Sequence, residues 1–190
     1  MNKTKKSIIE AAINIFSKRG YNGATIDEIV LEAGVVKGTL YYHFKSKEEI
    51  FNFIIDEGIK VLQNHLKDID NENIDPLEKL KNICRIQLTM LYKNKEFFRV
   101  LISQLWGQEI RQLQIRTRLL DYFKEIEIYI KEAMDEGLIK KGDANFMAHT
   151  FFGVLISSAV YEIFTIDKVD LDKVINNLID VSFYGLIGKN

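Results

Sequence analysis

The side chains best suited to chemistry in this sequence are hydrogen-bond donors gathered near the amino terminus, within residues 37–47. Ammonium and hydroxyl groups of this kind can reach the edges of bases or the phosphates of a nucleic acid. Gly38 lies among them and removes a side chain where a backbone would approach the floor of a groove. The donors are Lys37, Thr39, Tyr41, Tyr42 and Lys47.

Two short helices must position these donors. Thr25 and Glu28 have the spacing of a capping box, which predicts that a first helix begins at about Thr25. Gly34 can adopt the left-handed conformation that ends a helix, so a turn and a second helix should follow. The apolar face of the first helix is formed by Ile26, Ile29, Val30 and Ala33, which recur at helical spacing.

The second helix is expected over residues 36–44. Val36, Leu40 and Phe44 are spaced by four, which predicts that they stack along the face that packs on its neighbours. Gly38, Thr39, Tyr41 and Tyr42 then point largely away from that face. Gly38 costs such a helix roughly 1 kcal/mol relative to alanine, so its place on the outward face favours close contact with a partner.

Taken in order, the segment carries the pattern Thr25-Ile26, Ile29, Ala33-Gly34-Val35, Gly38-Thr39-Leu40-Tyr41, His43-Phe44 and Lys45-Ser46-Lys47-Glu48. This pattern resembles the DNA-binding domain of the TetR/AcrR family of transcriptional regulators. The resemblance covers about the first fifty residues, and its motif is highly specific.

The resemblance implies that residues 36–44 form a recognition helix. It implies DNA-facing positions at Lys37, Gly38, Thr39, Tyr41, Tyr42 and His43, and phosphate contacts at Thr25 and Lys47. Val36 departs from the family, which usually has a small polar residue there to cap the recognition helix. Valine cannot cap, and a lost cap typically costs about 1 kcal/mol, so this departure bears on the placement of Lys37.

Composition and charge fit a globular protein with one basic end. The 190 residues are 47% hydrophobic and 28% charged, with a formal net charge of -1, which excludes a disordered or broadly basic chain. Residues 1–47 hold eight basic and four acidic residues, whereas the remainder holds 18 basic and 23 acidic residues. This polarity suits phosphate contact at the amino-terminal end only.

Motifs for enzyme chemistry are missing from the sequence. It contains no G-x-S-x-G, P-loop or G-x-G-x-x-G pattern, and His43, His65 and His149 lack metal-ligand spacing. We therefore expect neither enzyme activity nor a cofactor or metal. Cys84 is the single cysteine, so an internal disulfide is excluded. Its helical pattern with apolar neighbours favours a core residue over a redox sensor.

The sequence predicts a cytoplasmic protein. The longest apolar runs, such as residues 151–160, are too short to span a bilayer. The amino terminus carries Glu10 and Asn14 within an amphipathic helix, which is unlike a secretory signal.

The periodicity predicts an all-α fold with two domains. We expect an N-terminal three-helix helix-turn-helix DNA-binding domain over residues 1–47 and a C-terminal effector-binding and dimerisation domain over residues 48–190. A connecting helix is predicted over 48–66 and a polar loop over 67–75. Further helices are predicted over residues 76–92, 95–106, 108–136, 143–164 and 170–186.

The last two helices predict a homodimer interface. The final helix has one apolar stripe of Leu171, Val174, Leu178 and Val181, with Ile175 and Ile179 beside it. This surface is wider than one contact uses, and a two-fold dimer would bury the second face. The alternative is that both stripes belong to a monomer core. The resemblance favours the dimer, because family members typically pair through these helices and bind palindromic operators.

Aromatic and polar side chains predict an effector site in the larger domain. Aromatic walls with a few polar groups are typical of small-molecule sites between helices, although core packing explains any single aromatic equally well. A lining of this kind fits a hydrophobic compound. The candidate ligand-binding residues are Gln87, Tyr92, Phe98, Gln104, Trp106, Tyr122, Tyr129, His149 and Phe152.

These expectations combine into one hypothesis with two alternatives. The chain is expected to be a homodimeric repressor that binds operator DNA and is released by a small effector. One alternative keeps the fold but makes the protein an activator or a ligand-independent regulator. The other is a helical module that binds a small molecule or a partner, with a vestigial helix-turn-helix whose aromatics are ordinary surface residues.

Overall fold

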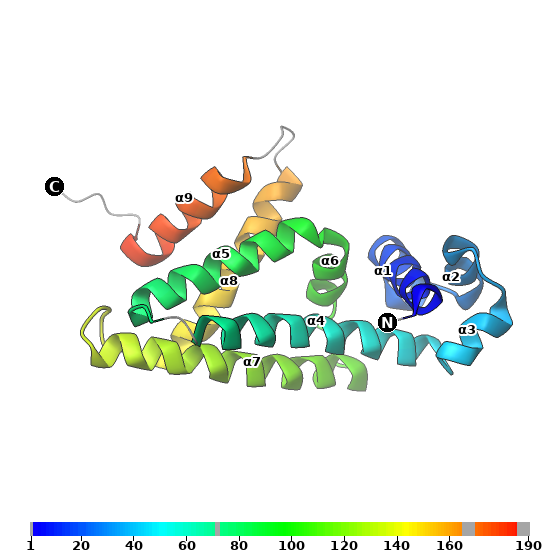
Figure 1. Cartoon of the computed structure of the whole chain (residues 1–190), viewed down its shortest axis with the longest axis horizontal. Helices are drawn as coiled ribbons and strands as arrows, with labels where there is room; N and C mark the ends of the chain where they lie inside the picture. Colours follow the sequence, from blue (N-terminus) through cyan, green and yellow to red (C-terminus); the bar gives the residue numbers. More distant parts are fainter. Residues whose placement is uncertain (1, 71–72, 165–169, 186–190) are drawn as a thin grey trace. The chain divides into compact units, whose positions relative to one another are not determined.

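The computed structural model describes residues 2–70, 73–164 and 170–185, and over these residues the only regular structure is α-helix (Figure 1). The predicted all-α class is confirmed. The helices are α1 (Lys3–Gly23), α2 (Ile26–Ala33), α3 (Lys37–His43), α4 (Lys47–Asp70), α5 (Pro76–Lys93), α6 (Lys95–Ser103), α7 (Ile110–Asp135), α8 (Ala144–Phe164) and α9 (Leu171–Tyr184).

The chain forms two compact units. Unit 1 comprises residues 1–60 and 95–116, and unit 2 comprises residues 61–94 and 117–190. The helices α4 and α7 therefore each contribute residues to both units. Unit 1 is larger than the DNA-binding domain predicted over residues 1–47, because it also contains the first half of α4, all of α6 and the start of α7. The functional boundary at residue 47 stays a prediction.

Unit 1 is built around α1, which packs on α2, α3 and α6. Asn2 caps the amino end of α1 by accepting a hydrogen bond from the Thr4 amide at 2.9 Å. Near the other end, Gly20 adopts a φ of 69°, and this break changes the direction of the chain before Tyr21. The apolar core of the unit includes Ile8, Phe16, Ile29, Leu40 and Phe51.

The connecting helix α4 is longer than its predicted span of 48–66. It continues to Asp70, so the first part of the predicted loop over 67–75 is helical. Leu66 and Ile69 are buried, and this tertiary burial outweighs the polar local sequence. Asp75 then accepts hydrogen bonds from the Leu77 and Glu78 amides and caps α5, with Pro76 in its first turn as predicted. Residues 71 and 72 lie outside the described residues.

Close packing within unit 1 explains Gly58 of α4. A Cβ atom at this position would collide with the ring of Phe97 on α6. The predicted helix over residues 95–106 ends earlier, at Ser103, and α7 begins at Ile110. The short connection from residue 104 to 109 belongs to unit 1 and carries Gln104 and Glu109.

Unit 2 contains a helical layer in which α5, α8 and α9 pack on one another. Ile175 and Ile179 of α9 are buried, whereas Val181 is exposed. The two apolar stripes predicted for the last helix thus differ in burial, with the Ile175 and Ile179 side packed within the chain. The described part of α9 ends at Tyr184, and Leu186, which was predicted to belong to it, lies outside the described residues. Within the parts of the chain that the structure describes, no helix is long and apolar enough to cross a membrane.

Candidate nucleic-acid interface

The first helix of the helix-turn-helix is fixed by its own sequence. The Glu28 amide donates to the Thr25 hydroxyl oxygen at 3.2 Å, and the Thr25 amide donates to the Glu28 carboxylate at 3.0 Å. The predicted capping box is therefore present. These hydrogen bonds from Thr25 lower the pKa of the Glu28 carboxyl below its ordinary value. The Thr25 hydroxyl also donates to the Glu28 carboxylate at 2.9 Å. The hydroxyl predicted to contact a phosphate is therefore already part of the helix cap.

The turn between α2 and α3 depends on Gly34. This residue adopts φ 65° and ψ 34°, the left-handed conformation that was predicted to end the helix. Its amide donates to the Leu31 carbonyl at 3.2 Å, and the Val35 amide donates to the Val30 carbonyl at 3.1 Å. An added side chain would meet no atom within 4 Å, so the requirement for glycine comes from the backbone conformation.

One expectation about α3 is wrong, because Val36 does not lie on the packing face. Leu40 and Phe44 are buried, but Val36 is 72% exposed. It is the N-cap residue with an extended backbone, so the four-residue helical spacing does not apply to its side chain. As predicted, Val36 provides no side-chain cap. The helix forms nevertheless, and the Val36 carbonyl accepts from the Thr39 amide at 2.9 Å.

The outward face of α3 carries the predicted DNA-facing groups. Lys37, Gly38 and Tyr41 are exposed, and Tyr42 is 84% exposed, while Thr39 and His43 are half-buried. A side chain at Gly38 would meet no atom of the protein within 4 Å. Its backbone is not in the left-handed region, so nothing within the chain requires glycine at this position. The DNA-facing role of these residues stays a prediction.

Lys37 is held at the start of α3 by an ion pair with α2. Its ammonium lies 2.8 Å from the Asp27 carboxylate. The hydrogen bond with Asp27 raises the pKa of Lys37, so the side chain stays charged. Both groups are exposed, which makes this pair weak and open to exchange with another anion. A phosphate could therefore replace Asp27 as the partner of Lys37.

Lys47 is more deeply engaged than its sequence position suggested. Its ammonium donates to the carbonyl oxygens of Tyr21 and Ala24, at 2.8 and 2.7 Å, and lies 4.6 Å from the centre of the Tyr21 ring. A cation is favourable beside carbonyls at the end of a helix. Lys47 therefore fastens the start of α4 to the end of α1, and its predicted phosphate contact would add to this positioning role.

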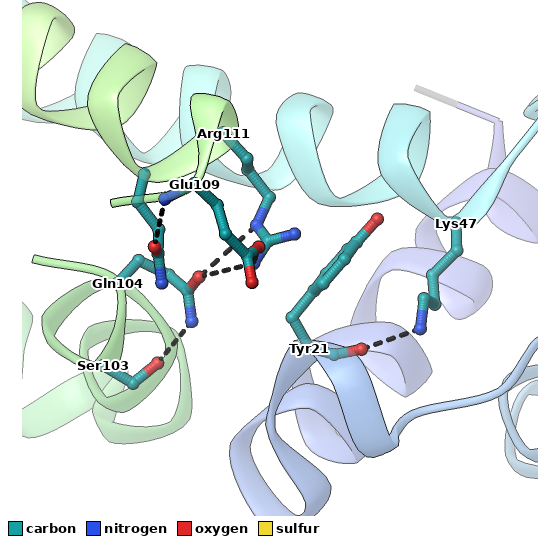
Figure 2. Close-up of polar contacts among 7 residues, drawn as sticks. Tyr21, Lys47, Ser103, Gln104, Glu109 and Arg111 are labelled. Carbon is teal, nitrogen blue, oxygen red and sulfur yellow. Dashed lines mark hydrogen bonds and ion pairs between the residues drawn. The ribbon is translucent and has the colours of Figure 1, made fainter. Parts of the chain in front are cut away.

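A second cation meets Tyr21 from the start of α7 (Figure 2). The Arg111 guanidinium lies 3.7 Å from the centre of the Tyr21 ring, in the range of a cation–π interaction. It donates to the Gln104 side-chain oxygen at 3.2 Å and to the Glu109 carboxylate at 2.8 Å. Gln104 in turn donates to the Ser103 hydroxyl at 2.9 Å. We call Tyr21, Gln104, Glu109 and Arg111 the Arg111 cluster.

The Arg111 cluster was not predicted from the sequence. All its members belong to unit 1, yet Tyr21 and Arg111 are 90 positions apart in the chain, and no local pattern relates them. Burial raises the pKa of the Tyr21 hydroxyl, while the nearby Arg111 acts in the opposite direction. The cluster connects the helix-turn-helix core with the segment between α6 and α7.

The predicted ligand-binding residues divide between the two units. Phe98, Gln104 and Trp106 belong to unit 1, where Gln104 is occupied by Arg111 and Trp106 is 70% exposed. The others belong to unit 2, namely Gln87, Tyr92, Tyr122, Tyr129, His149 and Phe152. The structure thus separates the set into two groups, and the ligand-binding role of each residue stays a prediction.

Some of the predicted ligand residues of unit 2 lie in two groups. The Phe123 ring lies 4.5 Å from His149 and 5.1 Å from Phe152, measured between ring centres, so Phe123 joins two predicted ligand residues. The second group centres on Tyr122, which interacts electrostatically with Cys84 and Tyr129. The Tyr129 hydroxyl donates to the Leu66 carbonyl at 3.2 Å. The His149 ring also contacts the Asn145 carbonyl, and His149 is an exposed residue.

Comparison with known proteins agrees with the geometry of the helix-turn-helix. Residues 8–54 match the model of bacterial regulatory proteins of the tetR family. A solved structure described as "Clostridium perfringens putative fatty acid metabolism regulator" is 44% identical, with a TM-score of 0.91, and the match covers 96% of this chain and 100% of that one. The chain belongs to the TetR family of transcriptional regulators.

Two further relatives extend the comparison. The uncharacterised HTH-type transcriptional regulator YerO of Bacillus subtilis is 29% identical over 82% of this chain, and the match spans only 57% of YerO. The transcriptional regulator FadR of Bacillus subtilis, solved in complex with stearoyl-CoA, is 23% identical with a TM-score of 0.76, covering 96% of this chain and 99% of that one. At this identity FadR shows the shared TetR-family fold. Such regulators bind DNA, which makes α3 the candidate recognition helix.

Proposed function

We propose that this TetR-family protein is a repressor that binds a palindromic operator as a homodimer and is released by an acyl-CoA effector. The observation that carries the DNA-binding part is the outward face of α3. That face presents exposed donors around Gly38, whose missing side chain has no explanation within the chain. We further propose that the protein acts as a regulator and not as an enzyme.

The electrostatics of the amino-terminal end support operator binding. Residues 1–47 carry an excess of basic over acidic side chains, and Lys37 and Lys45 are exposed beside the recognition helix. Such a surface attracts the phosphate backbone without specifying a sequence. Tyr41 and Tyr42 are then placed for contacts with bases, while Lys37 exchanges Asp27 for a phosphate. In this proposal Thr25, Gly38, Thr39, His43 and Lys47 complete the interface.

Homodimerisation through α8 and α9 is supported by their outward residues. Tyr161, Val181 and Tyr184 are large and exposed, although α9 already buries Ile175 and Ile179 within its own chain. Gly153 of α8 is exposed, and an added side chain would meet nothing within 4 Å, which suits the close approach of a second copy. A two-fold dimer would set two copies of α3 into successive major grooves, about 34 Å apart.

The effector class follows from the relatives and from unit 2. The 44% identical relative is described as a "putative fatty acid metabolism regulator", and the more distant FadR is solved with stearoyl-CoA. Aromatic side chains of α7 and α8, including Phe123 and Phe152, pack against one another within unit 2. Such an apolar interior suits an acyl chain. We therefore place the acyl group among the predicted ligand residues of unit 2.

The Arg111 cluster supplies a route from effector to operator. Arg111 lies in the first turn of α7, and the same helix continues into unit 2, where it carries Tyr122 and Tyr129. Effector binding would displace the first turn of α7, move Arg111 from the Tyr21 ring and tilt α4 through Lys47. A coupling free energy of about 1 to 3 kcal/mol would weaken operator affinity roughly 5- to 150-fold.

The deciding experiment is selection of bound fragments from random double-stranded DNA at near-physiological salt. The selected site is then titrated against scrambled DNA over a series of salt concentrations. A palindrome bound at least about 10³-fold more tightly than scrambled DNA would support an operator-binding dimer. Weak binding without an enriched sequence, together with a steep salt dependence, would contradict the proposal and favour a vestigial helix-turn-helix.

The effector part of the proposal needs a separate titration. Palmitoyl-CoA is added to the complex of protein and selected operator, and free CoA is added in a parallel sample. Release by palmitoyl-CoA alone supports the proposed effector class. Equal operator affinity with and without palmitoyl-CoA would exclude induction by this ligand, and the sign of regulation would then have to be measured by deleting the gene in a reporter strain.

A further inference from the structure

Two buried polar side chains in unit 2 have no hydrogen-bond partner within the protein. Gln87 on α5 is 2% exposed, and neither its amide nitrogen nor its amide oxygen is paired. Tyr122 on α7 is fully buried, and its hydroxyl is also unpaired. Native interiors pair the great majority of such groups, because a buried donor without an acceptor loses its hydration and gains nothing in return. The amide of Gln87 and the hydroxyl of Tyr122 therefore have hydrogen-bonding capacity that a bound ligand can use.

Cys84 relates Tyr122 to the helix that carries Gln87. The Tyr122 hydroxyl interacts electrostatically with Cys84, which lies on α5 one helical turn before Gln87. Burial raises the pKa of the Cys84 thiol to about 11 and also raises the pKa of Tyr122 above its ordinary value. Both groups consequently stay uncharged near neutral pH. These buried side chains therefore offer neutral hydrogen-bond donors and no thiolate or phenolate.

Other polar side chains near Tyr122 differ from Gln87 and Tyr122, because they already have interaction partners within the protein. Tyr129, two helical turns after Tyr122 on α7, donates to the Leu66 carbonyl at 3.2 Å. The Glu125 carboxylate, one turn from Tyr122, accepts from the Gln63 side chain at 2.8 Å. Arg118, one turn before Tyr122, has one guanidinium nitrogen without a hydrogen bond, but the residue is engaged through another interaction. The unpaired donors of Gln87 and Tyr122 are therefore not a general property of this region.

We propose that the Gln87 amide and the Tyr122 hydroxyl bind the carbonyl oxygen of an acyl thioester, an inference that rests on the acyl-CoA class proposed above. A carbonyl oxygen has two lone pairs and can accept one hydrogen bond from each side chain. It is uncharged, so it can enter an apolar interior at lower cost than a carboxylate. Glu125 interacts electrostatically with the Tyr122 hydroxyl and would repel a carboxylate bound there. The site therefore distinguishes an acyl thioester from a free fatty acid.

The test measures binding to the full chain without DNA, so that it is independent of operator recognition. Calorimetry compares palmitoyl-CoA with S-hexadecyl-CoA, a thioether that lacks only the carbonyl oxygen, and with free CoA and palmitate, all below micelle-forming concentrations. The variants are Tyr122→Phe and Gln87→Met, which remove the polar atoms with little change in volume. Tyr129→Phe is the control for the stability measurement only, because it removes a buried hydroxyl that already has a partner, while Tyr129 itself is one of the predicted ligand residues.

The proposal predicts opposite effects on binding and on stability. Each variant should weaken palmitoyl-CoA binding about tenfold, in line with the loss of one buried hydrogen bond. Neither should change the affinity for S-hexadecyl-CoA. Without ligand, Tyr122→Phe and Gln87→Met should melt at the same or a higher temperature than the wild type, since they remove unpaired groups. Tyr129→Phe should melt at a lower temperature, because the Leu66 carbonyl loses its donor.

Three outcomes would overturn the inference. Unchanged palmitoyl-CoA affinity in both variants, with a lowered melting temperature, would mean that the two groups only hold internal water. Tighter binding of palmitate than of palmitoyl-CoA would show a carboxylate site instead. If the wild type bound no palmitoyl-CoA, both this inference and the proposed effector class would fail, while enrichment of a palindrome in the DNA selection would still support operator binding.

Discussion

The helix-turn-helix in unit 1 and the buried surroundings of Gln87 and Tyr122 in unit 2 differ in how their polar side chains are paired. In the helix-turn-helix, polar side chains are capped, paired or open to solvent, as in the capping box of Thr25 and Glu28. In unit 2, Gln87 and Tyr122 are buried without partners. The first region has its shape without a ligand, whereas the second leaves hydrogen-bonding capacity unused. The difference suggests that the DNA-binding surface is already formed before DNA binds. The polar groups buried in unit 2 would gain their hydrogen bonds only when the effector binds.

The largest effect is expected from Leu40→Ala, which tests whether the helix-turn-helix depends on its core. Leu40 is fully buried beneath the exposed face of α3, so the change leaves a cavity. We expect the free energy of unfolding to fall by about 3 kcal/mol, with loss of operator binding. Urea unfolding measures this effect. A loss below about 1 kcal/mol would show that α3 contributes little to the stability of the protein.

Arg111→Gln tests whether the Arg111 cluster connects the two regions. The change removes the cation from the Tyr21 ring, which should cost stability by about 1 to 2 kcal/mol for a desolvated pair. The ratio of operator affinities without and with palmitoyl-CoA should then approach one. Arg116→Gln is the control, since Arg116 donates to the Leu105 carbonyl and stacks on no ring in the described contacts. Equal ratios in wild type and Arg111→Gln would remove the cluster from the proposed route.

Gly38→Ala tests whether the outward face of α3 binds DNA or is an ordinary solvent-exposed helix surface. Because an added methyl group meets nothing in the protein, we expect the free energy of unfolding to rise by up to about 1 kcal/mol. Operator affinity should fall by about tenfold, since the methyl group would stand between α3 and the groove floor. Thermal unfolding and operator titration give the two values. A more stable variant with full operator affinity would place Gly38 outside the interface.

The smallest effect is expected from Thr25→Ala, which removes the cap of α2. At neutral pH the loss should be about 1 kcal/mol. The pKa of Glu28 is lowered in the folded protein, so its contribution is present above the ordinary carboxyl pKa and lost as the pH falls through the folded value. Unfolding curves between pH 7 and 3 should therefore show a weaker acid dependence in the variant. Parallel curves for wild type and variant would show that Glu28 gains nothing from Thr25.

Local sequence signals account for what could be predicted in the helix-turn-helix. The capping box and the left-handed Gly34 depend on residues within four positions of one another, and both were predicted. Val36 was placed wrongly, because a four-residue spacing was applied to a residue that lies just outside its helix. The length of α4 was underestimated, since burial of Ile69 cannot be seen in a polar segment.

Contacts between distant residues were the part that the sequence could not predict. Tyr21 and Arg111 meet only because α1 packs within the same unit as the start of α7. Gln104 was predicted as a ligand residue from its type, but its amide already serves Arg111 and Ser103. Gln87 and Tyr122 were named among nine candidates, and only the structure distinguishes them from Tyr129, because pairing depends on which atoms come together.

The alkylation rate of the single cysteine can report how often this buried region opens. Cys84 is buried one turn from Gln87, and with a pKa of about 11 its thiol holds almost no thiolate at neutral pH. An alkylating reagent should therefore modify the folded protein only during the moments when α5 opens. The rate of that single modification counts those openings, and a ligand seated on Gln87 and Tyr122 would make them rarer.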